Sequence, residues 1–99
     1  MAWMYILRCA DDSYYVGSTR DLDARIWMHR AGRGAEYTKR RLPVELVHAT
    51  EFESAAEAFA MEKRAQGWSR AKREALISGD FTALPRLASR AKKRPPPSG

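Results

Sequence analysis

Residues 13–29, SYYVGSTRDLDARIWMH, contain a predicted strand followed directly by a predicted helix. The first part, YYVGST, is rich in aromatic and β-branched residues, which favour strands. Asp21 can then accept hydrogen bonds from the first amides of a helix that begins after it. Counted in helical steps, the face of this helix that holds Ile26 also holds Arg25 and His29. The stretch therefore predicts a helix whose apolar face carries a guanidinium and an imidazole.

The segments on either side complete the fold class. MYILRC, residues 4–9, predicts a strand, and the Asp- and Ser-rich turn after it predicts that the two strands form an antiparallel hairpin. Gly32 is a typical helix terminator. The later predicted elements are a Gly-rich basic loop (32–41), a strand (44–52), a helix from Ser54 to Gly67 with capping-box spacing to Glu57, and a helix from Ser69 to about Ile77. The order is ββαβαα, an α/β (α+β) chain with a small antiparallel sheet packed against helices.

The positive charge is concentrated in two places. The formal net charge is +6, and residues 86–99 contain five basic and no acidic side chains. The second concentration lies between residues 30 and 41. Such clusters suit contact with nucleic-acid phosphates, and the alternative is a solvated surface with a disordered tail. The candidate nucleic-acid-binding residues are Arg33, Tyr37, Lys39, Arg40, Arg41, Arg90, Lys92, Lys93 and Arg94.

Length and cysteine content limit the class of protein. A chain of 99 residues forms at most one domain, predicted over residues 1–80, and we expect the basic, Pro-rich tail over 81–99 to be disordered. The single cysteine, Cys9, excludes an intramolecular disulfide and fits a reducing compartment. The N-terminal stretch lacks the basic region of a signal peptide and is too short to span a membrane. We therefore expect a cytoplasmic protein.

The second long helix repeats the polar anomaly of the first. On one predicted face, Glu62 is flanked by Ala58, Phe59 and Gln66. Two structural explanations are open: Arg25 can extend to water along the edge of its face, or it can form an ion pair with Glu62. The alternative is a polar pocket between the helices and the sheet. A carboxylate, a guanidinium and an imidazole together suit phosphodiester chemistry, in which a carboxylate holds a divalent cation and an arginine neutralises phosphoryl oxygens.

Four short elements resemble the GIY-YIG nuclease family. MYI at 4–6 and YVG at 15–17 resemble its two signature tripeptides, with Met and Val in place of Gly and Ile. The motif R-x-x-x-H at 25–29 has the spacing of the family's catalytic arginine and the His or Tyr after it. Glu62 falls where the family keeps its metal-binding glutamate.

The likeness covers about residues 3–78. GAEYTKRRLPVELV (34–47) and GWSRAKREALI (67–77) also resemble a subgroup of small, single-domain bacterial members. The resemblance implies a central three-stranded antiparallel sheet with flanking helices. It also implies hydrolysis of nucleic-acid phosphodiesters with one divalent metal ion, Mg²⁺ or Mn²⁺. We expect DNA as the partner, including structured or damaged DNA in repair or recombination.

The resemblance also implies a role for each matching residue. Tyr5 would help to deprotonate the attacking water, while Tyr15 and His29 would orient the water and phosphate or relay the proton. Arg25 would stabilise the transition-state charge, and Glu62 would hold the metal. The polar residues on two apolar helix faces predict that these five side chains converge, and Arg25 and Glu62 on opposite sides of the sheet would contradict that site. Gly17 would let the backbone pass close to the helix that carries Arg25. Tyr37 would contact phosphate or anchor its loop.

Two positions depart from the family pattern. Many members carry a basic or polar residue just after the second tripeptide, where this chain has Ser18, and the small members resembled above favour lysine where it has Gln66. Loss of a cation there would weaken substrate binding or the rate. The alternatives to an endonuclease are a non-catalytic nucleic-acid-binding module and an accessory domain that acts through a protein partner, for which Trp27 and Trp68 could be exposed anchors.

Overall fold

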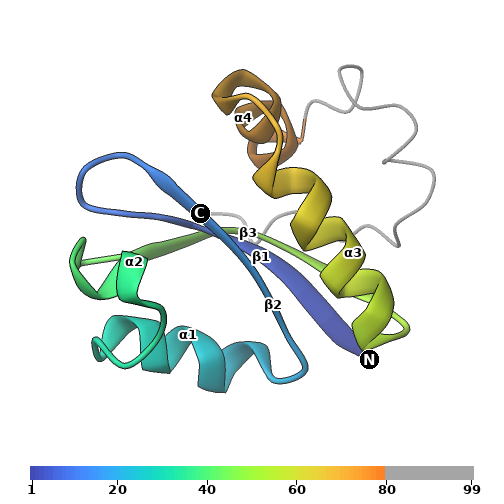
Figure 1. Ribbon diagram of the computed structural model, residues 1–99, viewed down its shortest axis with the longest axis horizontal. Helices are drawn as coiled ribbons and strands as arrows, with labels where there is room; N and C mark the ends of the chain where they lie inside the picture. The colour runs from blue at the N-terminus through green and yellow to red at the C-terminus, as the bar shows by residue number, and fades with distance from the viewer. Residues whose placement is uncertain (80–99) are drawn as a thin grey trace.

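A three-stranded antiparallel sheet forms the centre of the computed structural model, which describes residues 1–79 (Figure 1). The strands are β1 (Ala2–Arg8), β2 (Tyr14–Thr19) and β3 (Glu45–Phe52). Strand β1 lies in the middle, in the order β2-β1-β3. This confirms the predicted sheet and its β1–β2 hairpin. The predicted tail, with Arg90, Lys92, Lys93 and Arg94, lies outside the described residues.

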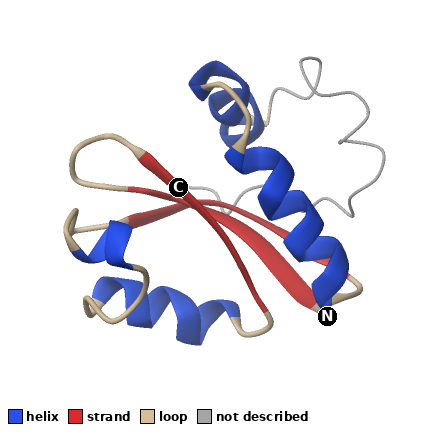
Figure 2. Cartoon of the chain, in the orientation of Figure 1, coloured by secondary structure: helices blue, strands red, loops and turns tan. Residues whose placement is uncertain are grey.

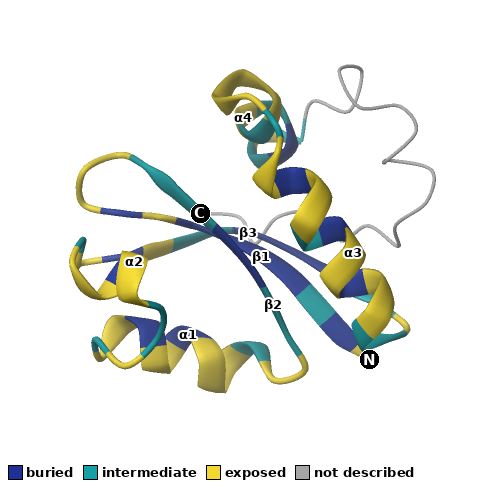
Figure 3. Cartoon of the chain, viewed as in Figure 1, coloured by how far each residue is buried: buried dark blue, intermediate teal, exposed yellow. Residues whose placement is uncertain are grey.

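Helices cover both faces of the sheet (Figure 2). They are α1 (Leu22–Arg30), α2 (Glu36–Lys39), α3 (Ala55–Gln66) and α4 (Arg70–Ser78). Helix α1, with α2 beside it, lies on one face, and α3 and α4 lie on the other (Figure 1). The buried side of each long helix is turned toward the strands (Figure 3).

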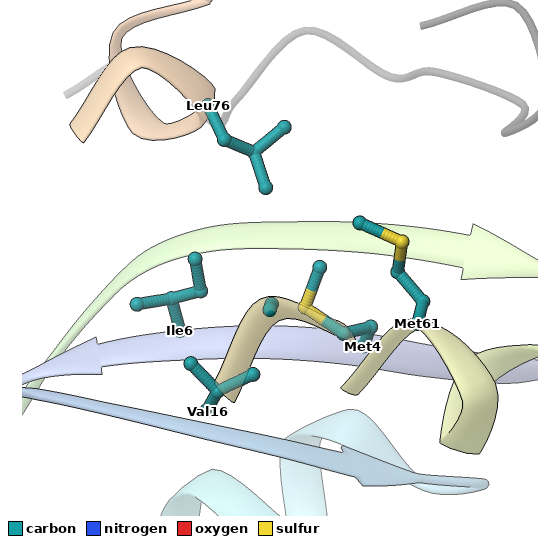
Figure 4. Packing of buried hydrophobic residues seen from close by; sticks show 6 residues of the cluster. Met4, Ile6, Val16, Met61 and Leu76 are labelled. Carbon is teal, nitrogen blue, oxygen red and sulfur yellow. The ribbon is translucent and has the colours of Figure 1, made fainter. Parts of the chain in front are cut away.

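Alternation along β1 produces two cores. Because successive strand residues point to opposite faces, Met4 packs with Met61 of α3, whereas Tyr5 packs with Ile26 of α1. Figure 4 shows the first core between the sheet and the α3–α4 pair. The buried members of this core are Met4, Ile6, Val16, Met61, Ala65 and Leu76. The second core comprises Tyr5, Leu7, Cys9, Ile26, Val44 and Ala49.

Local capping explains why the three long helices begin where the sequence predicts. The side chain of Asp21 accepts a hydrogen bond from the backbone amide of Ala24 at 3.2 Å. Ser54 and Ser69 each accept one in the same way, at 3.1 and 3.2 Å. Each cap satisfies an amide that has no partner inside the helix. Gly79 follows α4 with a φ of 81°, a conformation that glycine adopts without a steric penalty.

The basic loop contains a helical turn that the sequence analysis did not predict. Residues 36–39 form α2, a helix too short to show a hydrophobic period. The amide of Lys39 donates to the carbonyl of Ala35 at 3.0 Å, and the amide of Arg41 donates to that of Thr38 at 3.0 Å. Thr38 is fully buried and ties this turn to α1 through His29.

The prediction of which side of α3 is buried is wrong, because the buried side is rotated around the helix axis from the predicted one. Ala58, Met61 and Ala65 are buried, whereas Phe59 is 52% exposed. Glu62 lies half-buried at the margin of the buried face. Alanine is small enough to lie on either the buried or the exposed side of a helix, so the alanines did not indicate which face is buried. In the structure that face contains Met61, which packs into the first core.

The helices within residues 1–79 include no candidate membrane span. None of them combines the length and the hydropathy that a membrane-spanning helix requires.

Candidate active site

Three aromatic side chains from three different elements meet beside the second core. They are Tyr5 of β1, Tyr15 of β2 and His29 of α1. Their ring centroids lie 5.2 Å apart for Tyr15 and His29, 5.7 Å for Tyr5 and His29, and 6.5 Å for the two tyrosines. The Tyr5 hydroxyl lies 2.9 Å from Nε2 of His29, within hydrogen-bond distance. The structure thus brings together three of the five residues that the sequence predicted to converge.

The burial of His29 is compensated at both ring nitrogens. His29 is 1% exposed, as its helical phase predicts. Nε2 contacts Tyr5, and Nδ1 lies 2.8 Å from Oγ1 of Thr38. A buried imidazole is costly unless its polar atoms have partners, so these contacts explain how it can lie among apolar side chains. Burial, followed by the positive charge of Arg25, lowers the pKa of His29 below its ordinary value.

Gly17 makes room for a side chain rather than for a helix. A Cβ at Gly17 would lie 2.5 Å from the hydroxyl oxygen of Tyr5 and 2.6 Å from Cζ. Gly17 is paired with Tyr5 across the β1–β2 ladder. The expected close approach to the helix that carries Arg25 is therefore corrected: the nearest neighbour is the ring of Tyr5, which needs this space.

Arg25 lies exposed on α1, at the border of its buried face. Its guanidinium forms no hydrogen bond or ion pair with the other residues in the described part of the chain. Its charge still reaches the aromatic cluster, because it lowers the pKa of both His29 and Tyr5. For Tyr5 that effect is smaller than the opposing effect of burial, which raises the pKa above its ordinary value.

Glu62 is held against the edge strand by two neutral donors. Ser18 Oγ donates to Oε1 at 2.6 Å, and Gln66 Nε2 donates to Oε2 at 2.8 Å. The same Gln66 amide lies 3.3 Å from the carbonyl oxygen of Val16 in β2. Ser18 and Gln66, the two positions that the sequence analysis singled out, are therefore the two that orient this carboxylate.

The prediction of one pocket that holds both Arg25 and Glu62 between the helices and the sheet is wrong. Arg25 lies on α1 and Glu62 on α3, and these helices cover opposite faces of the sheet (Figure 1). The two side chains do not form the ion pair that was one alternative; Glu62 is bonded to Ser18 and Gln66 instead. The reason is topological: helical periodicity does not specify which face of a sheet a helix covers.

The charges of Arg25 and Glu62 nevertheless both act on Tyr15, because Tyr15 lies on β2, an edge strand of the sheet. Burial raises the pKa of Tyr15 above its ordinary value, Glu62 raises it further, and Arg25 lowers it. Tyr5 senses the same two charges with the same signs. The candidate site therefore wraps around the β2 edge, with the guanidinium on one side and the carboxylate on the other.

Some side chains of the basic loop contact other described residues, and others are exposed. The Arg41 guanidinium lies 3.8 Å from the Tyr37 ring centroid and pairs with Asp11 at 3.1 Å. The other neighbour of Tyr37 is Tyr15, stacked at 6.0 Å. These contacts tie Tyr37 and Arg41 to the site and to each other. Arg40 forms an exposed ion pair with Glu36, and Arg33 and Lys39 are exposed.

The carboxylate of Glu62 could hold a divalent metal ion as a single protein ligand. Among residues 1–79, no group of three or more His, Cys, Asp or Glu side chains could enclose a metal ion. Mg²⁺, however, commonly takes one or two carboxylates, retains several waters and is completed by substrate phosphate. Each Glu62 oxygen accepts one protein hydrogen bond and keeps acceptor capacity.

The fold is that of a small α+β domain with a three-stranded antiparallel sheet, and the tripeptides MYI and YVG lie on its paired strands β1 and β2. Residues 1–75 match the family described as the GIY-YIG catalytic domain. The chain belongs to the GIY-YIG family.

Proteins similar to this chain carry the name UPF0213. One from Natronomonas pharaonis is 42% identical over 78 residues, which cover 79% of this chain and 92% of that protein. One from Halobacterium salinarum is 45% identical over 77 residues, covering 78% of this chain and all of that protein. The solution NMR structure of UPF0213 protein BH0048 from Bacillus halodurans superposes with a TM-score of 0.52 at 38% identity, covering 91% of this chain and 95% of that one.

The opposing effects of two charges on Tyr15 can be measured. Glu62→Gln removes a negative charge and should lower the pKa of Tyr15, whereas Arg25→Ala removes a positive charge and should raise it. Ultraviolet or NMR titration, with Tyr15 identified by Tyr15→Phe, measures both shifts. Glu57→Gln, an exposed carboxylate on the same helix, is the control. Two shifts of the same sign, or none, would contradict a site shared across the β2 edge.

Proposed function

We propose that this chain is a metal-dependent endonuclease that hydrolyses phosphodiester bonds of DNA, including branched, flapped or damaged DNA. One observation supports this most strongly: a hydrogen-bonded Tyr5–His29 pair adjoins Tyr15, with a guanidinium and a carboxylate acting electrostatically on both tyrosines. Membership of a family whose matching region is described as a catalytic domain supports the same reaction class.

In the proposed reaction, Tyr5 and His29 handle protons. As the attacking water gives a proton to the Tyr5 oxygen, the Tyr5 hydroxyl proton moves to Nε2 of His29 in the same step, so no free phenolate has to form on a tyrosine whose burial raises its pKa. The water oxygen forms a bond to phosphorus as the bond from phosphorus to the 3′ oxygen breaks, and that oxygen takes a proton from solvent. The Tyr15 hydroxyl, in a more exposed position than that of Tyr5, orients the water and phosphate.

Charge stabilisation comes from the two sides of the β2 edge. Arg25, exposed and without a partner among the described residues, is available to contact the phosphoryl oxygens. Glu62 would hold one Mg²⁺ or Mn²⁺, with Ser18 and Gln66 fixing the carboxylate. The bound ion would supply Lewis-acid stabilisation of charge on the phosphate and the departing oxygen.

The surface around the site suits a nucleic-acid strand. A hollow of about 310 Å³ lies beside Tyr15, between Tyr37 and Gln66. A second hollow, of about 420 Å³, adjoins Ser18 and Phe59. Between residues 20 and 39, five exposed basic side chains have no ion pair with another described residue, and we assign them to contact with the strand; they are Arg20, Arg25, Arg30, Arg33 and Lys39.

The test of this function is a cleavage panel. Supercoiled plasmid and labelled linear, flapped and four-way-branched DNA are incubated with Mg²⁺, Mn²⁺ or EDTA, and matched RNA substrates test the choice of DNA. We expect cleavage of DNA with either metal and none with EDTA. Cleavage of RNA alone would overturn the DNA assignment. Binding without cleavage of every substrate would favour the non-catalytic module.

The basic tail should add affinity without chemistry. Replacing Arg86, Arg90, Lys92, Lys93 and Arg94 with glutamine removes five cations from residues 86–99, which have no acidic side chain. We expect weaker DNA binding and a flatter salt dependence, by up to about 0.9 in logarithmic slope for each phosphate that the tail no longer neutralises. Fluorescence anisotropy over a salt series measures both, with Pro95–Pro97 replaced by alanine as the uncharged control. An unchanged slope would exclude a phosphate-binding role for the tail.

A further inference from the structure

The hydrogen bond between His29 and Thr38 has chemical consequences beyond burial. Thr38 is fully buried, and its hydroxyl lies 2.8 Å from Nδ1 of His29. The same hydroxyl donates to the carbonyl oxygen of Ala35 at 3.0 Å. A hydroxyl has a single proton, so while Thr38 gives it to Ala35 it can only accept a hydrogen bond from His29. That arrangement requires a proton on Nδ1.

A proton on Nδ1 determines the role of the opposite ring nitrogen. His29 is buried and close to the positive charge of Arg25, which both favour the neutral imidazole. A neutral imidazole carries one N–H, so with Nδ1 protonated Nε2 has a free lone pair. The Tyr5 hydroxyl, 2.9 Å away, then donates to Nε2. With a proton on Nδ1, the hydrogen bonds run in one direction, from Tyr5 through His29 and Thr38 to Ala35.

We propose that Thr38 is a positioning residue that holds His29 in the Nδ1–H tautomer, so that Nε2 is a base directed at the Tyr5 hydroxyl. In the other tautomer, Nε2–H would donate to Tyr5, and the tyrosine could not pass its proton to His29. With Nδ1–H in place, transfer breaks the O–H bond of Tyr5 and forms an N–H bond at Nε2. The imidazolium that results still donates to Thr38, so no side chain has to rotate.

The loop backbone fixes the imidazole from a second direction. A Cβ at Gly34 would overlap Nδ1 of His29 and lie 2.8 Å from Cγ and Cε1. The ring therefore occupies the space that a side chain at position 34 would need, and glycine is the residue that fits beside Nδ1. Residues 34–38 thus act as a unit that sets the position of the ring and the hydrogen-bond direction at Nδ1.

The tautomer can be measured in the free protein, without substrate or metal. The side-chain nitrogens of ¹⁵N-histidine-labelled protein are assigned by NMR at neutral pH, with His29→Gln identifying the signals. We expect a protonated Nδ1 and an unprotonated Nε2 in the native chain and in Thr38→Ser. In Thr38→Val, which keeps the shape and loses the hydroxyl, we expect the population to shift toward Nε2–H.

The chain offers a matched control pair on the other face of the sheet. His48 Nε2 lies 2.6 Å from Oγ1 of Thr50, and both residues are buried. Thr50→Val should change the His48 signals and leave those of His29 unaltered. A native His29 with its proton on Nε2, or a folded Thr38→Val with unchanged His29 signals, would overturn the proposal. The native spectrum decides the tautomer even if Thr38→Val fails to fold.

The consequence for catalysis rests on the proposed function and has a separate readout. Once cleavage is established, Thr38→Val should lower kcat by about a hundredfold, in the range of one general-base contribution, with KM little changed. Thr38→Ser should restore most of the rate. Equal loss in both variants would contradict the positioning role, whereas absence of cleavage in the native chain would count against the endonuclease and leave the tautomer measurement intact.

Discussion

Glu62→Gln is expected to abolish metal-dependent cleavage while DNA binding stays the same or becomes slightly tighter. The substitution keeps the shape of the side chain and an acceptor for Ser18, and it removes the charge that would hold the cation. Within residues 1–79, no cluster of acidic or imidazole side chains offers a replacement site. The loss should exceed about a thousandfold, since a bound metal ion supplies several kcal/mol of charge stabilisation.

Single-turnover cleavage of a labelled DNA substrate and anisotropy with the same DNA measure the two effects separately. Glu57→Gln is the matched control, an exposed acid on the same helix whose conversion to glutamine retains its capping geometry. If Glu62→Gln cleaves as fast as the native chain, the assignment of the metal position is wrong. If Glu57→Gln loses activity as well, the effect comes from the overall charge of α3.

Arg25→Ala is expected to reduce the cleavage rate and to weaken DNA binding as well. Its guanidinium has no partner among the described residues, and its field reaches the hydroxyls of Tyr5 and Tyr15. We assign it to the phosphoryl oxygens, where charge develops in the transition state. Removing one such interaction costs about 10²–10³ in rate, or roughly 3–4 kcal/mol.

Two control variants test whether the effect of Arg25→Ala comes from the geometry of the guanidinium, from its charge, or from the loss of any exposed arginine. Arg25→Lys keeps the charge and loses the planar fork, so it should restore binding more fully than rate. Arg64→Ala removes an exposed arginine of α3 and should leave the rate unchanged. A rate for Arg25→Ala within about threefold of the native rate, far short of the expected loss, would contradict a transition-state role for this side chain.

Local sequence signals were sufficient for the helix boundaries and for part of the site. Asp21, Ser54 and Ser69 cap helices as predicted, because an N-cap depends only on the three residues that follow it. The phase of α1 correctly placed His29 in the interior. Arg25 was harder to place, since it lies at the border of that face, where its exposure depends on the neighbouring elements.

Several tertiary features could not be predicted from the sequence. The Ala-rich pattern of α3 left its phase ambiguous, and no periodicity indicated that α1 and α3 cover opposite faces of the sheet. Thr38 and Gly34 were missed because their partner, His29, lies across a loop, nine residues from Thr38. The signal that could have indicated them is the need of a buried imidazole for a partner at each nitrogen.

The central claim, metal-dependent phosphodiester cleavage by this site, has one direct measurement. Metal-free native protein and metal-free Glu62→Gln are each bound to the same end-labelled branched DNA, and Mg²⁺ is then added. We expect the native chain to cut the bound DNA within one turnover and Glu62→Gln to hold it uncut, with EDTA stopping the native reaction. Native protein that binds this DNA and leaves it intact with both Mg²⁺ and Mn²⁺, or a Glu62→Gln variant that cuts equally well, would contradict the claim.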